Sequence, residues 1–151
     1  MISRFALIAF GLLALTSCSR SPDSSPNTLV TVYKSEGCGC CEKWVHHLEQ
    51  AGFAVDVHNL DNLGPTKERV GIPPAMGSCH TAVVGGYFVE GHVPAEDIKR
   101  LLREHPDAKG LTVPAMPVGS PGMEVPGKSQ PYDVFLVSKD GSTSVYAHHG
   151  G

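Results

Sequence analysis

The sequence predicts an α/β domain, and three patterns carry that prediction. A β-branched and aromatic run at 29–33 is followed by apolar residues at helical spacing over 41–50. An alternating run at 53–58 is typical of a second strand. Further along, two apolar runs at 81–84 and 87–90 flank a Gly-Gly pair, which suits the positive φ angles of a hairpin turn.

The remaining elements follow in chain order. Residues 62–70 indicate a short helix, and residues 94–105 indicate another that a proline ends. A loop rich in proline, glycine and methionine is expected from 111 to 130, and long loops of this kind tend to be functional. Two apolar runs at 132–137 and 144–147 flank an Asp-Gly turn and predict a last hairpin.

This order of elements resembles the thioredoxin-like fold, with an inserted Pro/Gly/Met-rich loop and a C-terminal hairpin. In that fold, the segment that enters the first hairpin lies beside the turn between the first strand and the first helix. The segment here is 78–81. The resemblance therefore implies that Cys79 lies next to Cys38 and Cys41.

The first residues predict export and a lipid anchor. Arg4 precedes an apolar run at 5–15 that is too short to span a membrane. The run ends in Leu-Thr-Ser-Cys, which resembles the bacterial lipobox, so we expect residues 1–17 to be a lipoprotein signal peptide and Cys18 to carry the lipid. Ser19 favours the periplasmic face of the outer membrane. An ordinary cleaved signal with an incidental cysteine is the alternative.

The rest of the chain is expected to form a tether, one domain and a tail. Residues 18–28 are rich in serine and proline and predict a flexible tether. Residues 29–148 have the length of one domain, and residues 149–151 are assigned to the tail. The terminal pair His148 and His149 is interpreted as disordered chain rather than as a metal scavenger. A net charge of −3 without a basic stripe argues against nucleic acid as a partner.

Three cysteines lie within four residues where a strand pattern changes to a helix pattern: Cys38, Cys40 and Cys41. Backbone N–H groups and the dipole at a helix start favour thiolates, which attack disulfides and bind soft metals. Cys79 brings the number of cysteines in the domain, without Cys18, to four. An even number would allow two structural disulfides in an oxidising compartment. Neighbours such as Cys40 and Cys41 cannot both serve ordinary disulfides from one turn, so we favour metal binding.

Four sulfurs around one helix start could hold Zn²⁺, Cu(I) or an iron–sulfur cluster. A structural zinc site usually draws its thiols as separated pairs from two loops. Thiolates that bridge several soft ions suit the C-x-C-C spacing better, and Cu(I) favours such bridging. Thioethers from Met116 and Met123, in poor packing contexts, would add soft donors, whereas Met76 could equally fill the core.

The histidines differ in how well they qualify as metal ligands. His80 adjoins Cys79 and is the best imidazole candidate, and His92 could either line the site or cap a turn. His46 and His47 fall on the polar face of the first helix, where a solvated role is expected.

Two other functions stay open. Cys38 and Cys41 have the C-x-x-C separation of a thiol–disulfide oxidoreductase, although Cys40 could then scramble the disulfide. A structural zinc-binding domain is the second alternative. An interaction-only lipoprotein would leave the cysteine cluster unexplained.

With these residues in view, the chain resembles the CopG-like metal-binding proteins, also called domain of unknown function 411. The resembling motifs are 33–41, 78–82, 90–95 and 116–124, within a span of about 30–137. Ala115 is a departure, because glycine is expected before the Met-Pro pair.

The resemblance implies a thioredoxin-like, periplasmic protein with a role in copper resistance. It implies copper, as a multinuclear Cu(I) thiolate centre that could cycle to Cu(II), and it leaves open whether the protein stores, passes on or oxidises the metal. Periplasmic copper-handling proteins would be its partners. The residues carried over by position are Cys38, Cys40, Cys41 and Cys79, together with His80, Met116 and Met123.

Overall fold

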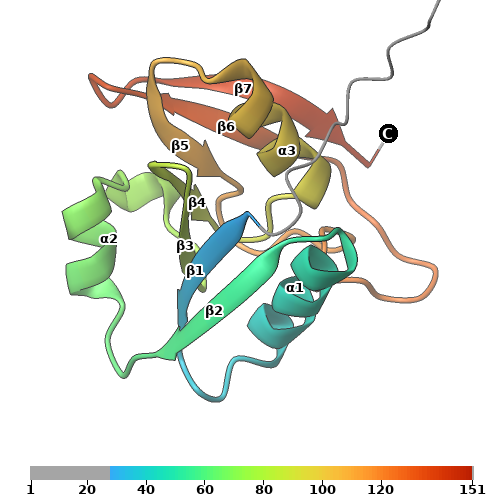
Figure 1. The fold of residues 1–151 in the computed structure, drawn as a ribbon. Helices are drawn as coiled ribbons and strands as arrows, with labels where there is room; N and C mark the ends of the chain where they lie inside the picture. The colour runs from blue at the N-terminus through green and yellow to red at the C-terminus, as the bar shows by residue number, and fades with distance from the viewer. Residues whose placement is uncertain (1–27, 151) are drawn as a thin grey trace, which may run out of the picture.

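The computed structural model describes residues 28–150, which form a mixed α/β structure around one seven-stranded sheet (Figure 1). The strand order is β2-β1-β3-β4-β5-β6-β7. The strands are β1 (Leu29–Lys34), β2 (Ala54–Asn59), β3 (Thr81–Val84), β4 (Tyr87–Glu90), β5 (Ala108–Thr112), β6 (Tyr132–Ser138) and β7 (Thr143–His149). The helices are α1 (Gly39–Gln50), α2 (Gly64–Val70) and α3 (Ala95–Glu104), with a 3₁₀ turn at Pro74–Met76. The expected signal peptide and Cys18 lie outside the described residues.

The connections follow from the direction of each strand pair. Strand β1 is parallel to β2, and β4 is parallel to β5. Because parallel neighbours need a crossover, α1 joins the first pair and α3 joins the second. The other pairs are antiparallel, and Gly85 and Gly86 turn the β3–β4 hairpin with φ angles of 56° and 86°.

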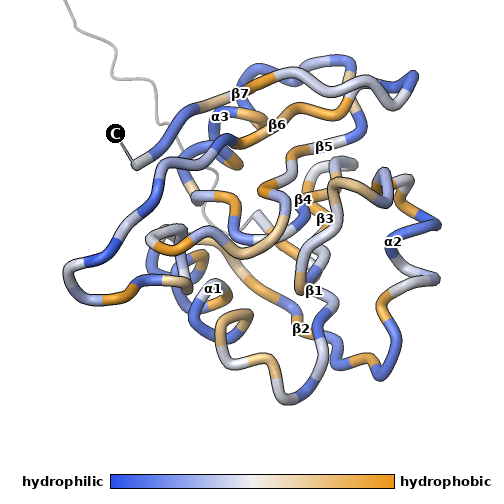
Figure 2. Tube along the Cα trace, turned by 180° about the vertical axis from the view of Figure 1, so that it is seen from behind, coloured by the Kyte–Doolittle hydropathy of each residue, from blue (hydrophilic) through white to orange (hydrophobic). Residues whose placement is uncertain are grey.

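Helices α1 and α3 cover one face of the sheet, and α2 lies toward the other. Trp44 and Leu48 of α1 and Ile98 of α3 share the main hydrophobic core with inward-facing residues of β1, β3, β4 and β5. Side chains alternate along a strand, so Val89 joins this core while Phe88 joins a smaller cluster beside the end of α2. Figure 2 shows the hydrophobic colour on β3, β4 and β6 and hydrophilic colour along much of α2.

No helix within the described residues 28–150 has both the length and the apolar character that a membrane crossing requires.

The α/β prediction is confirmed, including the β3–β4 hairpin and the C-terminal β6–β7 hairpin, but the predicted start of the inserted loop was wrong. Leu111 and Thr112 belong to β5. The sequence of this strand gives no clear alternation, because Gly110 stands in its middle. A Cβ at Gly110 would lie 2.0 Å from the carbonyl oxygen of Phe88, so the close approach of β4 requires glycine where the pattern calls for a side chain.

The interpretation of the chain end as disordered was also wrong. His148 and His149 belong to β7, where they pair with Asp133 and Tyr132 of β6. The His148 ring contacts the Asp133 carboxylate, and His149 Nε2 lies 2.7 Å from a carboxylate oxygen of Asp97. Cross-strand and long-range contacts of this kind leave no local sequence signal.

Replacing Ala115 by glycine should stabilise the protein by about 0.5–1 kcal/mol. Ala115 is an exposed residue with φ at +60°, a conformation that costs an L-residue about 1–2 kcal/mol. Glycine removes this strain, but it also raises the conformational entropy of the unfolded chain, which offsets part of the gain in stability. Chemical denaturation measures the change. The matched control is Ala75→Gly in the 3₁₀ turn, also exposed, which should destabilise. Equal effects of the two substitutions would contradict the strain at Ala115.

Candidate metal centre

Three of the four cysteines within residues 28–150 lie at the start of α1, and the local sequence explains why. Cys38 is the N-cap residue and makes no side-chain capping bond, while Cys40 and Cys41 belong to the first turn. Glu42 adds a carboxylate to that turn, where the helix dipole favours it. Its partner is Lys34 at the end of β1, whose fully buried ammonium lies 2.5 Å from the Glu42 carboxylate. This ion pair joins the two ends of the segment that carries the thiols.

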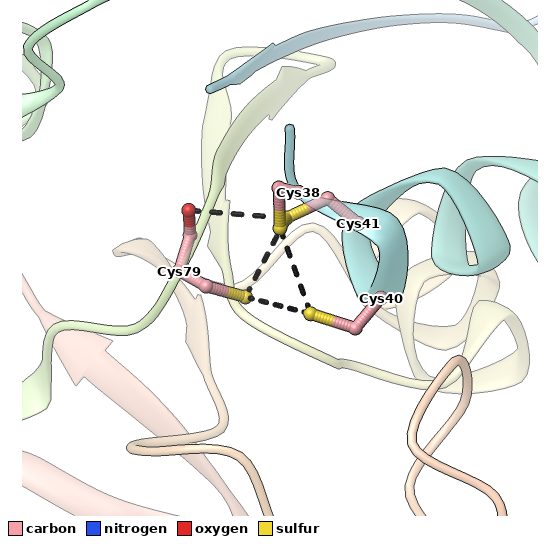
Figure 3. A group of neighbouring side chains, drawn as sticks. All are labelled: Cys38, Cys40, Cys41 and Cys79. Carbon is pink, nitrogen blue, oxygen red and sulfur yellow. Dashed lines mark hydrogen bonds between the residues drawn. A yellow bond between two sulfur atoms is a disulfide. The ribbon is translucent and has the colours of Figure 1, made fainter. Parts of the chain in front are cut away.

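Cys79 approaches the three sulfurs from the segment that leads into β3 (Figure 3). Its Sγ lies 3.7 Å from Cys41 Sγ and 4.0 Å from Cys40 Sγ. Cys40 Sγ in turn lies 3.5 Å from Cys38 Sγ. All four sulfurs lie within 4.8 Å of one another, a grouping that could hold a metal ion. The expected meeting of Cys79 with the cluster is confirmed.

Cys38 and Cys41 are joined by a disulfide, and Cys40 and Cys79 are free. The structure therefore presents the site with two of its four thiols oxidised. Each free sulfur lies close to a different sulfur of the disulfide, Cys40 to Cys38 and Cys79 to Cys41. Reduction by two electrons and two protons would give four thiols at nearly the same place.

Two buried imidazoles adjoin the Cys79 sulfur. His80 Nδ1 lies 3.2 Å from it and His92 Nε2 lies 3.1 Å from it, so these residues form a second group that could hold a metal ion. His92 Nδ1 donates to the carbonyl oxygen of Pro121 at 2.8 Å. Its Nε2 is then unprotonated and directs its lone pair toward the sulfur. The other ring nitrogen of His80 is buried and has no hydrogen-bond partner among the described residues.

Burial sets the protonation of these groups. Burial, and then the neighbouring Cys40, raise the pKa of the Cys79 thiol to about 12. Burial lowers the pKa of His80 to about 3, with smaller contributions from His92 and Lys67, and burial also lowers the pKa of His92. Both imidazoles are therefore neutral at pH 7 and available as ligands, whereas a metal that binds Cys79 must displace its proton.

The inserted loop packs against the first turn of α1. Gly122 has φ at +85°, and a Cβ there would lie 2.7 Å from the carbonyl oxygen of Cys40 and 2.9 Å from the amide nitrogen of Trp44. The adjacent Pro121 is the residue that accepts the His92 bond. The loop thus covers the side of the site formed by Cys40 and His92.

The three methionines that the sequence singled out lie in different settings. Met123 directly follows Gly122, so its backbone is next to the first turn of α1. Met116 is 48% exposed and lines a pocket of about 280 Å³ with Tyr132 and Asp133 among others. Met76 ends the 3₁₀ turn, and its carbonyl oxygen accepts a bond from the Thr112 hydroxyl. Ligation by Met116 and Met123 stays a prediction.

The two helix histidines behave differently. His46 is exposed and contacts Gln50, as expected of a solvated residue. His47 is half-buried, and its Nε2 accepts the backbone N–H of Ala95 at 3.1 Å, which satisfies a free donor at the start of α3. His47 is therefore a structural residue, a role that its sequence position did not reveal.

Sequence reasoning left His92 undecided and did not single out Glu90, the last residue of β4. His92 had a weak signal, because it lies in a glycine- and proline-rich motif between two elements. Glu90 ended an apolar strand and carried no sign that it would be fully buried.

The fold and the site together define a mixed α/β protein with a cysteine and histidine cluster that is able to hold a metal ion. The family model described as "Protein of unknown function, DUF411" matches residues 76–123. Two solved structures, named Copper resistance protein CopG, Form 1 and Form 2, are each 47% identical to the chain. Form 1 aligns with a TM-score of 0.77 over 82% of this chain and 98% of its own length. Form 2 aligns with a TM-score of 0.78 over 81% and 98%.

The chain therefore belongs to the CopG-like family, DUF411, as its motifs predicted. No curated protein matches it.

Proposed function

We propose that this protein binds copper as Cu(I) through Cys38, Cys40, Cys41 and Cys79 and contributes to copper resistance. The observation that carries the proposal is the gathering of four sulfurs within 4.8 Å of one another at a helix start. Thiolates are soft ligands that select Cu(I), and the helix dipole offsets their negative charge. The copper resistance proteins that are 47% identical to the chain support the choice of metal.

Several ions bridged by shared sulfurs suit this geometry better than one. Cys38, Cys40 and Cys41 come from a single helical turn, so one tetrahedral ion could not use all three with ease, whereas bridging allows each sulfur to serve two ions. His80 and His92 flank Cys79 and would supply nitrogen ligands on that side. Mixed sulfur and imidazole ligation suits both oxidation states of copper, which supports cycling between Cu(I) and Cu(II) as part of the proposal.

The proposal extends to the fold. We assign residues 29–104 to a thioredoxin-like unit, supported by the order β2-β1-β3-β4, the parallel β1–β2 pair and the C-x-x-C spacing at the start of α1. The inserted loop and β5 to β7 would then extend this unit beyond β4.

The proposal also places the protein on the periplasmic face of the outer membrane, anchored through a lipid on Cys18. The support is the apolar run that ends in Leu-Thr-Ser-Cys. Periplasmic copper-handling proteins would exchange the metal with it. Incorporation of labelled palmitate that depends on Cys18 tests the anchor.

A second candidate is a thiol–disulfide oxidoreductase, and the Cys38–Cys41 disulfide favours it. A thiolate released from this bond would lie at a helix start, where its pKa is lowered. The two functions differ in what they require of Cys40. Dithiol exchange needs only Cys38 and Cys41, whereas a bridged copper centre needs Cys40 as well.

Replacing Cys40 by serine should remove most of the copper. Protein purified under reducing conditions from copper-supplemented cells is analysed for copper and zinc by mass spectrometry, and insulin reduction is measured in parallel. We expect several copper ions per chain in the wild type and at most one in Cys40→Ser. The control is His148→Ala, a histidine of β7 that belongs to neither group of possible metal ligands and should keep its copper. Insulin reduction that tolerates Cys40→Ser, in a protein without copper, would favour the oxidoreductase, and a zinc-loaded protein indifferent to copper would contradict both.

A further inference from the structure

A buried carboxylate lies one hydrogen bond away from the backbone that carries Cys79. Glu90 ends β4 and is fully buried, on the sheet face that α2 covers. Its Oε1 accepts the backbone N–H of Ser78 at 2.6 Å, and Ser78 immediately precedes Cys79. The same oxygen accepts a hydrogen bond from the ammonium of Lys67 in α2, with which it forms an ion pair.

Thr81 completes the network. Its hydroxyl donates to Glu90 Oε2 at 2.6 Å and accepts from Lys67 Nζ at 3.0 Å. Both carboxylate oxygens are therefore used, and the donors come from α2, from β3 and from the Ser78 backbone. Such a carboxylate is fixed in position, because a shift toward any one donor would weaken the bonds to the others.

The same short segment is held from two further sides. Gly91 has φ at +72°, and a Cβ there would lie 2.6 Å from Ser78 Cβ and 2.5 Å from the carbonyl oxygen of Val113. The Ser78 hydroxyl donates to the carbonyl oxygen of Ala115 in the inserted loop. Ser78 is thus held by the Glu90 carboxylate, by close packing against Gly91 and by a hydrogen bond to the inserted loop.

We propose that Glu90 is a positioning residue for the copper site, which holds Cys79 against the Cys38, Cys40 and Cys41 sulfurs through its bond to the Ser78 amide. This inference rests on the proposed function. Stability alone is a weak reason for the network, because replacing a buried ion pair by apolar residues of similar size is often neutral or stabilising. A metal site, in contrast, requires ligands held within about 0.5 Å, and outer partners supply that precision.

Two double substitutions separate positioning from stability. Lys67→Met with Glu90→Gln removes both charges but keeps an oxygen that can accept the Ser78 N–H. Lys67→Met with Glu90→Leu removes the charges and that oxygen. Neither pair leaves an unpaired buried charge, so the two variants differ in the acceptor for the Ser78 N–H and in the partner of the Thr81 hydroxyl.

Cu(I) affinity is measured on the reduced proteins by competition with a chromogenic chelator, together with the ultraviolet thiolate-to-copper absorption. We expect the glutamine pair to bind Cu(I) as the wild type does. The leucine pair should bind it about 10–100-fold more weakly and with an altered absorption band. It should unfold at a lower temperature than the glutamine pair, because two hydrogen bonds lose their acceptor, but stay folded at the temperature of the binding assay. Hydrogen exchange of the Ser78 amide should be faster in the leucine pair alone.

Equal Cu(I) affinity and equal Ser78 exchange in the two pairs would overturn the inference while leaving the proposed function intact. A wild-type protein that binds no Cu(I) would instead remove the proposed function, and this inference with it. If the leucine pair does not fold, Glu90→Asp decides, because it keeps the charge for Lys67 but shortens the reach to Ser78. A loss of about tenfold in Cu(I) affinity is then expected, and unchanged affinity would refute the positioning role.

Discussion

Reducing the Cys38–Cys41 disulfide should raise the copper content of the protein from at most one ion to several ions per chain. A metal ligand must be a thiolate, and a sulfur engaged in a disulfide no longer offers that charge. Among the cysteines of residues 28–150, only Cys40 and Cys79 remain free in the oxidised state, with sulfurs 4.0 Å apart. Two thiolates can hold one Cu(I) between them, but they cannot bridge a cluster.

The measurement uses the same protein in two states, prepared with and without a phosphine reductant and separated from it before anaerobic Cu(I) is added. Copper is counted by elemental analysis, and the disulfide is verified by alkylation and mass spectrometry. The matched control is Cys38→Ser/Cys41→Ser, which cannot form this disulfide and should hold at most one Cu(I) under either condition. An oxidised wild type with as much copper as the reduced protein would contradict the thiolate cluster.

This behaviour would make copper capture dependent on the redox state of its surroundings. In the oxidised state the Cys40 and Cys79 sulfurs lie 3.5 and 3.7 Å from the sulfurs of the disulfide, so its reduction would gather four thiols at one place. The observed disulfide is therefore compatible with metal capture and with dithiol exchange alike, and the difference between the two lies in the use of Cys40 and Cys79.

The sequence was sufficient for the parts of the site that local patterns encode. The strand-to-helix change placed Cys38 and its neighbours at a helix start, and the resemblance of the element order to the thioredoxin-like fold predicted that Cys79, 38 residues from Cys41, would meet them. The Gly85-Gly86 pair defined the β3–β4 hairpin, which fixes where the Cys79 segment enters the sheet.

The parts that escaped prediction depend on contacts between distant segments. Glu90 closes an apolar strand, and only the meeting of α2, β3 and the Ser78 backbone makes its burial possible. His47 looked solvated because its partner, the Ala95 amide, lies 48 residues away. Gly110 hid β5, since its lack of a side chain reflects the approach of β4. Local periodicity contains none of this information.

Replacing Gly122 by alanine should destabilise the protein and weaken copper binding far more than the same change at Gly127. Both glycines belong to the inserted loop and have positive φ angles, 85° and 70°, so both substitutions carry the strain of about 1–2 kcal/mol for an L-residue. They differ in what surrounds them. A Cβ at Gly127 meets nothing within 4 Å, whereas a Cβ at Gly122 meets the backbone of Cys40 and Trp44.

Backbone atoms at 2.7 and 2.9 Å cannot rotate away as a side chain would, so the loop or the start of α1 must move. Overpacking of this kind costs about 1–3 kcal/mol beyond the strain, and a loop that lifts would also release the Pro121 carbonyl from His92. Chemical denaturation of the reduced protein measures the first effect, and Cu(I) competition measures the second. We expect Gly122→Ala to lower the Cu(I) affinity at least tenfold and Gly127→Ala to leave it unchanged. Equal affinities in the two variants would mean that the loop does not shape the copper site, and the Met116 and Met123 thioethers would then lose their main support as ligands.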